Sequence, residues 1–271
     1  MWCWYLVRKS DEAVQVSEHI SSYVLQLTDY CSQKTSFFSD PDFPESMSKT
    51  YKGVRILFFE EIYETYSRLD FTMERDRSVG MAGLETRLAR VYNARARYGL
   101  LDVFNHPSYL RRSLLWQRAS KTEALRRIRY PEHRQVPTWS WMALMGPIAY
   151  VDIPFDVVVW SDDLESPFNE HLAPERDDVA NTRHRTIRGA ARTFVQQPAD
   201  EVVLDREPND SGLVLTCVVL GTQHQDGRDR HYGIVVSRID GQKVYERIGV
   251  VTFERTQEWL KTEGTLKVEV V

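Results

Sequence analysis

The chain has 271 residues, of which 42% are hydrophobic and 27% are charged, and its formal net charge is −4 at pH 7. This composition is ordinary for a soluble globular protein. No apolar run approaches the ~20 residues that a membrane helix needs, and the basic pair Arg8-Lys9 follows the apolar N-terminus instead of preceding it, which excludes a typical secretory signal. Cys3, Cys31 and Cys217 are odd in number and share no short spacing, so they predict neither a disulfide framework nor a zinc site. We expect a cytoplasmic protein.

Residues 1–135 are predicted to form a helical region. The spacing of apolar residues predicts an amphipathic helix near residues 20–31 and a second helix over 54–66, separated by a Pro- and Ser-rich loop or linker near 36–50. A third helix is predicted to start at Asp76 and to end at Tyr98-Gly99, with an inward face made by Met81, Leu84, Leu88, Val91 and Tyr92. Pro107 suits the first turn of a fourth helix that ends near Trp116.

Residues 136–271 are predicted to form a β-rich region, because the apolar period changes from about 3.6 to 2 at Pro137. Trp139-Ser140-Trp141 is interpreted as the start of a strand with both indoles on one face, which anchor a core; the alternative is a stacking platform for a base or ligand. Further strands are predicted over residues 156–160, 185–195, 213–222, 231–238, 243–253 and 266–271. Asp240-Gly241 predicts a tight hairpin turn in which Gly241 is less replaceable than Gly227 in the second predicted turn.

These patterns together predict an α+β fold in which N-terminal helices precede a mainly antiparallel sheet or a small β-sandwich. The β-rich region is expected to pack on the helices and to form one continuous globular unit with them.

Several motifs resemble a known family. The stretch from Val136 to Tyr150, VPTWSWMALMGPIAY, resembles the signature R-x-P-S-W-S-W-A-S-x-x-G-x-I-x-Y that follows the domain of fungal heterokaryon-incompatibility (HET) proteins, with Thr138 and Met142 as departures. Tyr66–Thr72, Tyr98–Leu101 and Leu114–Trp116 resemble the elements that precede it, and Tyr232–Val236 and Tyr245–Val250 resemble the closing strands. The residues that carry this resemblance most directly, here called the signature residues, are Trp116, Pro137, Trp139, Trp141, Gly146, Tyr150, Tyr245, Arg247 and Gly249.

The resemblance covers residues 55–260 and implies a role in non-self recognition. The residues before Tyr66 show no counterpart of the HET domain, which is similar to TIR domains. We therefore expect this chain to correspond only to the region that follows the HET domain in the family. A doubly wound domain needs several βαβ units of about 30 residues each, and the periodicity before Tyr66 supports none. The chain alone is therefore expected not to hydrolyse NAD and to act through a protein partner, possibly one that carries a HET domain.

Charge is unevenly distributed along the chain. Residues 84–134 hold twelve Lys and Arg against four acids, whereas residues 152–180 hold nine acids against one Arg. The two segments are expected to be solvated or to pair with each other. The alternatives are an acidic protein partner and a nucleic-acid surface; the latter is disfavoured because no nucleic-acid-binding motif accompanies the basic segment.

Catalytic signatures are few. The sequence contains no nucleophile elbow, phosphate-binding loop, dinucleotide fingerprint or H-E-x-x-H motif, and no cofactor is predicted. His224, Asp226, Asp229 and His231 have the right atoms for a metal or a proton relay, but two arginines interrupt them and polar hairpin tips are common. Glu60, Glu61 and Glu64 are expected to lie on the solvated face of their helix. The preferred hypothesis is a non-catalytic interaction module; the alternative is an enzyme with a site near His224–His231, with Cys217 in a nearby strand.

Overall fold

The computed structural model describes residues 52–120, 122–168, 186–206, 215–256, 258–262 and 265–271. The helix predicted near residues 20–31 and the linker predicted near 36–50 lie outside this part of the chain. Residue contacts divide the chain into two compact units, residues 1–59 and 60–271. Helix α4 (Lys52–Ser67) crosses this division. The helices after α4 and all the described strands belong to this second unit.

The three predicted helices that fall within the described residues are present, although their ends differ from the predicted ones. After α4 come a short 3-10 turn, η1 (Glu74–Asp76), then α5 (Arg77–Tyr92) and α6 (Pro107–Leu114). Helix α5 starts directly after Asp76, as predicted, although the Asp76 side chain makes no capping hydrogen bond. Its buried positions include Arg77 and Glu85 beside the apolar Met81, Leu88 and Tyr92, while the predicted Leu84 and Val91 are only half-buried.

The prediction that the third helix continues to Tyr98-Gly99 is wrong. The helix ends at Tyr92 because Asn93 takes up a left-handed conformation with φ 47°. Strands β1 (Ala94–Arg97) and β2 (Leu100–Val103) then form a hairpin inside the predicted helical region. Tyr98 and Gly99 form its turn, with φ 56° and 79°. Alanine and arginine favour a helix, so the composition of β1 concealed the hairpin.

Helix α6 is buried along its whole length after Pro107, which occupies the first turn as predicted. Arg111 and Arg112 reach out of it to backbone carbonyls on either side of β7 (Val158–Trp160). Arg111 Nε donates to Ser161 O at 2.7 Å, after β7, and Arg112 donates to Ile153 O and Pro154 O at 2.9 and 3.0 Å, before it. These bonds offset the desolvation of the two guanidiniums. The basic segment therefore contacts the described part of the acidic segment largely through backbone carbonyls.

Two small antiparallel pairs connect the helices with the large sheet. Strand β3 (Trp116–Arg118) pairs with β6 (Ile148–Tyr150), so that Trp116 lies opposite Tyr150. Strand β4 (Arg126–Arg127) pairs with β5 (Leu144–Met145). Two 3-10 turns lie between β4 and β5 in the chain, η2 (Glu132–Arg134) and η3 (Trp141–Ala143).

The large sheet contains β7 (Val158–Trp160), β8 (Ile187–Phe194), β9 (Glu201–Leu204), β10 (Leu215–Gln223), β11 (Asp229–Arg238), β12 (Tyr245–Arg255) and β13 (Leu266–Val270). Its order is β11-β10-β8-β13-β12-β9, with β7 added to β10. Because β11 also pairs with β12, the strands β8, β10, β11, β12 and β13 close into a ring. All the pairings are antiparallel except β12 with β13. The α+β class with a mainly antiparallel sheet is confirmed, whereas β9 was not predicted.

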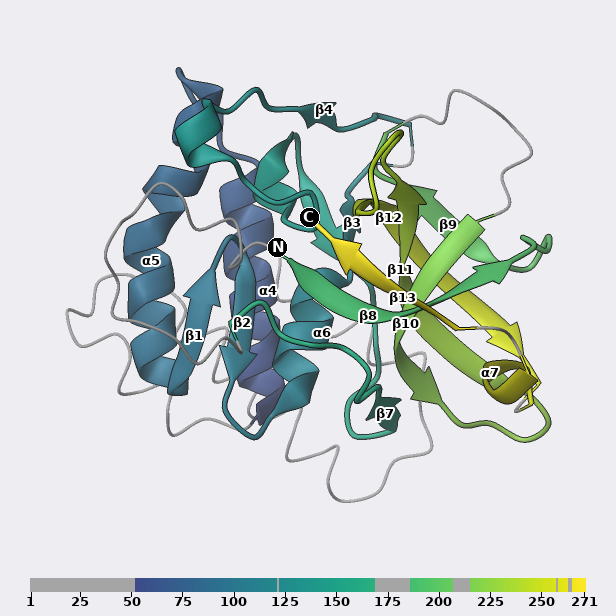
Figure 1. Cartoon of the computed structure of the whole chain (residues 1–271). Helices are drawn as coiled ribbons and strands as arrows, with labels where there is room; N and C mark the ends of the chain where they lie inside the picture. Colours follow the sequence, from purple (N-terminus) through teal and green to yellow (C-terminus); the bar gives the residue numbers. More distant parts are fainter. Residues whose placement is uncertain (1–51, 121, 169–185, 207–214, 257, 263–264) are drawn as a thin grey trace. The chain divides into compact units, whose positions relative to one another are not determined.

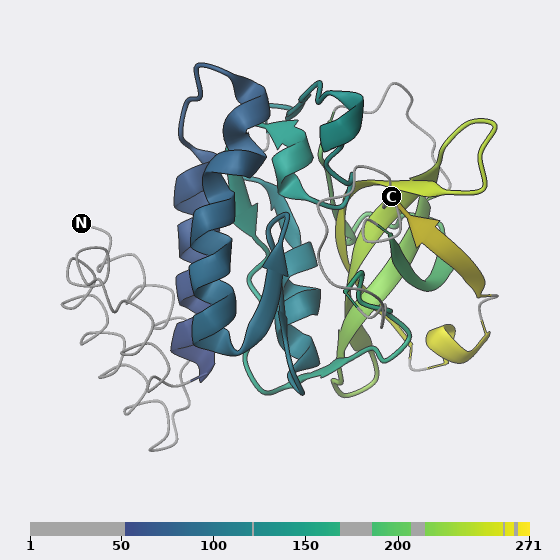
Figure 2. The same ribbon diagram turned by 60° about the vertical axis from the view of Figure 1, so that its left-hand side comes forward.

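The two faces of this sheet belong to different apolar clusters. One cluster joins α6 to the sheet through residues such as Leu110, Leu114, Val218 and Ile234, and it includes Trp139. The other lies on the opposite face around Phe194 and Phe253, where the short helix α7 (Trp259–Thr262) also packs. Figures 1 and 2 show the β1–β2 hairpin between α5 and α6, with the strands of the sheet beyond α6. The sheet and α6 thus share one continuous core.

The Asp240-Gly241 turn joins β11 to β12. Gln242 N donates to Ile239 O at 3.0 Å, and Gly241 has φ 72°. Gly227, in the loop between β10 and β11, has φ 83°, and a Cβ at either glycine would meet no atom within 4 Å. The geometry therefore does not support the predicted difference between the two positions.

Candidate functional site

Trp139, Ser140 and Trp141 do not form the predicted strand. Trp139 and Ser140 lie in a turn, and Trp141 begins the 3-10 turn η3, whose first backbone N–H groups need an acceptor. Ser140 supplies it, because its hydroxyl accepts a hydrogen bond from Met142 N at 3.1 Å. The prediction that both indoles share one face is therefore wrong.

The two indoles point into different parts of the core. Trp139 is fully buried in the cluster between α6 and the sheet, edge-to-face with Tyr98 at 6.2 Å between ring centres. Trp141 is also fully buried, but its ring lies 5.6 Å from that of Tyr63 and 5.0 Å from the Arg77 guanidinium. The two tryptophans therefore anchor the core, as predicted, and connect the helices with the sheet. Neither ring is exposed enough to serve as a stacking platform for a base or ligand.

The β1–β2 turn is fixed by the same residues. Ser140 Oγ donates to Tyr98 O at 2.6 Å, and the Glu85 carboxylate accepts from Gly99 N at 2.6 Å. A Cβ at Gly99 would lie 2.2 Å from Trp141 Nε1. The backbone is therefore so close to the indole that only glycine fits at this position. Burial raises the pKa of Glu85 to about 7, although the backbone hydrogen bonds that the carboxylate accepts lower it. Glu85 was not predicted as functional, although its spacing from Met81 and Leu88 places it on the inward face of α5.

Arg247 is the centre of a second buried group. Its side chain is 0% exposed and forms an ion pair with Asp205 at 3.0 Å. Its guanidinium carbon lies 3.2 Å from the centre of the Trp116 ring, and its guanidinium donates to Trp116 O. Burial lowers the pKa of Arg247 to about 10 and raises that of Asp205 to about 6, and each partner opposes the other's shift.

Thr138 connects this group to the end of β13. Arg247 N donates to Thr138 Oγ1 at 3.1 Å, and both Thr138 N, at 2.9 Å, and the Thr138 hydroxyl donate to Val271 O. Val271 N donates in turn to Tyr245 O at 3.0 Å. Pro137 is buried beside Thr138. Hydrogen bonds of Thr138 and Val271 therefore connect the segment around Pro137 with the segment from Tyr245 to Gly249.

The remaining signature residues also have structural contacts. Tyr150 N donates to Glu64 Oε1 at 2.9 Å, and Gly146 O accepts from Arg77 at 3.1 Å. Gly249 faces strand β9, where an added Cβ would lie 2.5 Å from Val203 O. Seven of the nine signature residues are buried, whereas Gly146 and Tyr245 are half-buried. Asp205, which completes the site, was missed because it belongs to the unpredicted strand-end sequence Leu204-Asp205-Arg206.

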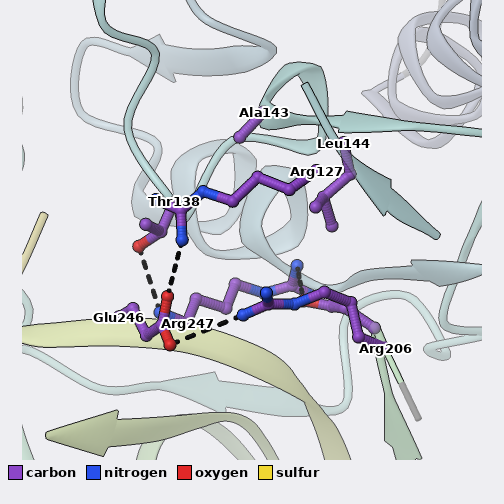
Figure 3. Close-up of a pocket in the computed structure, with 8 residues that line it drawn as sticks. Arg127, Thr138, Ala143, Leu144, Arg206, Glu246 and Arg247 are labelled. Carbon is purple, nitrogen blue, oxygen red and sulfur yellow. Dashed lines mark hydrogen bonds and ion pairs between the residues drawn. The ribbon is translucent and has the colours of Figure 1, made fainter. Parts of the chain in front are cut away.

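The surface above Arg247 carries a group of charges, here called the Arg127 triad: Arg127, Glu246 and Arg206. Glu246 forms ion pairs with Arg127 at 3.0 Å and with Arg206 at 3.5 Å. The two arginine side chains are 51% and 42% exposed. Figure 3 shows Arg127, Glu246 and Arg206 around Arg247. The small cavity between them is lined by Arg127, Thr138, Ala143, Leu144, Asp205, Arg206, Glu246 and Arg247.

An open groove lies on the other side of β4. It has a volume of about 570 Å³ and is lined by Ser67, Arg68, Leu69, Asp70, Ala119, Ser120, Ala124, Arg126, Met145, Gly146 and Pro147. Leu69 is 49% exposed in it, and Arg126 forms an ion pair with Glu74 on its edge. No local pattern in the sequence indicates this groove, because its wall combines three segments that are far apart in the chain.

The predicted histidine cluster is not assembled as one site. His224 pairs with Asp229 at 3.1 Å, whereas the buried His231 shares a hydrogen bond of 3.0 Å with Thr222 and lies between the rings of Phe253 and Trp259. Asp226 is exposed. Burial lowers the pKa of His231 to about 4. Within the described ranges, no three His, Cys, Asp or Glu side chains are placed to hold a metal ion.

The other candidate reactive groups, Cys217 and the glutamates of α4, are wholly or partly buried. Cys217 is fully buried, and burial raises the pKa of its thiol to about 12, which disfavours the nucleophilic thiolate. The prediction that Glu60, Glu61 and Glu64 are solvated is wrong, because all three are half-buried. Glu64 accepts from Tyr150 N, and Glu60 lies 3.8 Å from the Arg112 guanidinium.

No family model, curated protein or solved structure matches this chain. In the part of the chain that the structure describes, no helix has the length and apolar character needed to cross a membrane.

Proposed function

We propose that this chain is a non-catalytic interaction module, similar to the region that follows the HET domain in fungal heterokaryon-incompatibility proteins, and that it binds a protein partner carrying such a domain. The order of the family-like motifs supports the proposal. It is also supported by the use of all nine signature residues in packing, which gives those motifs a structural reason to occur together.

The observation that carries the proposal is the groove beside β4. Its volume of about 570 Å³ is in the range of sites that hold a bound ligand or peptide side chains. Its wall combines the exposed Leu69 with polar and basic groups from Ser67, Arg68 and Arg126. A concave surface that combines an apolar side chain with polar and basic groups can accept a side chain of a protein partner.

The test is site-specific photo-cross-linking in cells of the source organism. Benzoylphenylalanine replaces Leu69 in the groove, and in a matched control it replaces Val195, which is 74% exposed at the end of β8. The proposal predicts a discrete protein adduct from position 69 that position 195 does not give, and mass spectrometry identifies a partner with a HET domain. Equal adducts from both positions, or none from position 69, would refute it.

A further inference from the structure

The Arg127 triad has more donors than its own acceptor uses. Glu246 offers one carboxylate, while Arg127 and Arg206 carry five N–H donors each. Each guanidinium reaches that carboxylate through one nitrogen, at 3.0 and 3.5 Å. The triad therefore carries one excess positive charge on a surface where both arginines remain about half exposed.

The buried pair below does not neutralise this excess. Arg247 and Asp205 balance each other, since their ion pair joins one cation and one anion. Arg247 Nε and Asp205 Oδ1 are nevertheless buried without a hydrogen-bond partner among the described residues. Both residues line the same small cavity as the triad. These two atoms are buried too deeply for a surface ligand to reach, so the donors that remain available to an incoming acceptor are those of the half-exposed Arg127 and Arg206.

We propose that Arg127 and Arg206 form a carboxylate-binding site whose present occupant is Glu246, and that an acidic segment of the protein partner displaces Glu246 from it. This inference rests on the proposed function and names the chemistry of the partner. Arginine pairs suit carboxylates because the planar fork allows two parallel hydrogen bonds. An incoming carboxylate takes both guanidiniums, while the Glu246 side chain, which is 23% exposed in its ion pairs, turns to solvent.

The position of β4 links this site to the groove. Arg126 and Arg127 are successive residues of β4, and they pair with carboxylates on different elements: Arg126 with Glu74 beside α5, and Arg127 with Glu246 on β12. One strand thus separates the groove from the triad. A partner segment with an apolar side chain in the groove and an acidic residue beyond it would contact both sides of β4. This arrangement favours an acidic peptide over a nucleic acid, whose regular phosphates call for a longer basic surface.

The experiment measures the binding of a fluorescent polyglutamate peptide to the full chain by anisotropy at low ionic strength. Glu246→Gln should tighten binding about fivefold, because it removes the internal competitor, and Arg206→Gln should weaken it about tenfold. Arg188→Gln is the matched control, since Arg188 is half exposed and pairs with Glu165 and Glu269 elsewhere on the sheet; it should leave binding unchanged. Melting temperatures confirm that each variant is folded.

Three results would overturn the inference: unchanged or weaker binding by Glu246→Gln, equal losses in Arg206→Gln and Arg188→Gln, or stronger binding of a single-stranded oligonucleotide than of polyglutamate. Inorganic phosphate serves as a second probe, and preference for it over polyglutamate would also count against a peptide carboxylate. The cross-link from position 69 separates the two proposals. If that adduct forms while the triad variants bind polyglutamate normally, only the inference fails; if the adduct is absent, the proposed function fails.

Discussion

The Arg247 guanidinium stacks on the Trp116 ring, with 3.2 Å between the guanidinium carbon and the ring centre, and neither side chain is exposed to solvent. Trp116 belongs to β3 and Arg247 to β12, so this contact joins the small β3–β6 pair to the large sheet. The Asp205 carboxylate holds the guanidinium in place at 3.0 Å. A cation stacked on an aromatic face in a desolvated site contributes roughly 2 kcal/mol, in addition to its ion pair.

Replacing Arg247 should therefore be strongly destabilising. Arg247→Met leaves the Asp205 carboxylate buried without its counter-ion, and breaking a buried pair in this way costs about 3–5 kcal/mol. Urea unfolding of the variant measures the loss. Arg188→Met, which breaks an exposed pair, should cost at most about 1 kcal/mol. Similar losses for both variants would show that the Arg247 site is not the buried anchor described above.

The tryptophans of the turn should each be needed for stability. Trp139→Ala and Trp141→Ala remove large side chains that are fully buried, and each should cost roughly 3–5 kcal/mol in the free energy of unfolding. Val195→Ala, at a largely exposed position, should change little. If both tryptophan variants melt like the wild type while a binding activity is lost, the rings act in recognition, and the structural role is refuted.

Gly99 and Gly241 should respond differently to alanine although both have positive φ. Gly241→Ala meets no neighbour and should cost only the left-handed backbone term, about 1–2 kcal/mol. Gly99→Ala carries the same term and also forces its Cβ against the Trp141 indole, so its loss should be clearly larger. Gly227→Ala should behave like Gly241→Ala. Thermal unfolding compares the three variants, and an equally mild effect at Gly99 would contradict the close approach to Trp141.

Local periodicity predicted much of the fold but little of the site. The helix over residues 54–66 and the strands over 215–255 follow patterns that neighbouring residues determine. The Trp139–Trp141 turn was mistaken for a strand, because two aromatics spaced two apart satisfy the strand period while the cap made by Ser140 decides the backbone. The Arg247–Asp205 pair and the groove join residues far apart in sequence, so no local pattern indicates them.

Glu85 should make stability depend on pH. Burial raises its pKa in the folded state from 4.5 to about 7, so between these values the folded chain binds more protons than the unfolded chain. The free energy of unfolding therefore decreases as pH rises from 4.5 to about 7, and the contribution is constant outside this range. Glu85→Gln keeps an acceptor for Gly99 N but does not ionise, so its stability profile should be flatter. Urea unfolding at a series of pH values makes the comparison, and parallel profiles would disprove the assignment.

The central claim is that the chain binds a protein partner through the groove beside β4. The most direct measurement is the affinity, by isothermal titration calorimetry, of the partner captured at position 69 for the wild-type chain and for two charge substitutions. Leu69→Asp places a carboxylate in the groove and should weaken binding at least about tenfold, whereas Val195→Asp should bind like the wild type. Equal affinities for all three proteins, with each variant folded, would contradict the proposed interaction surface.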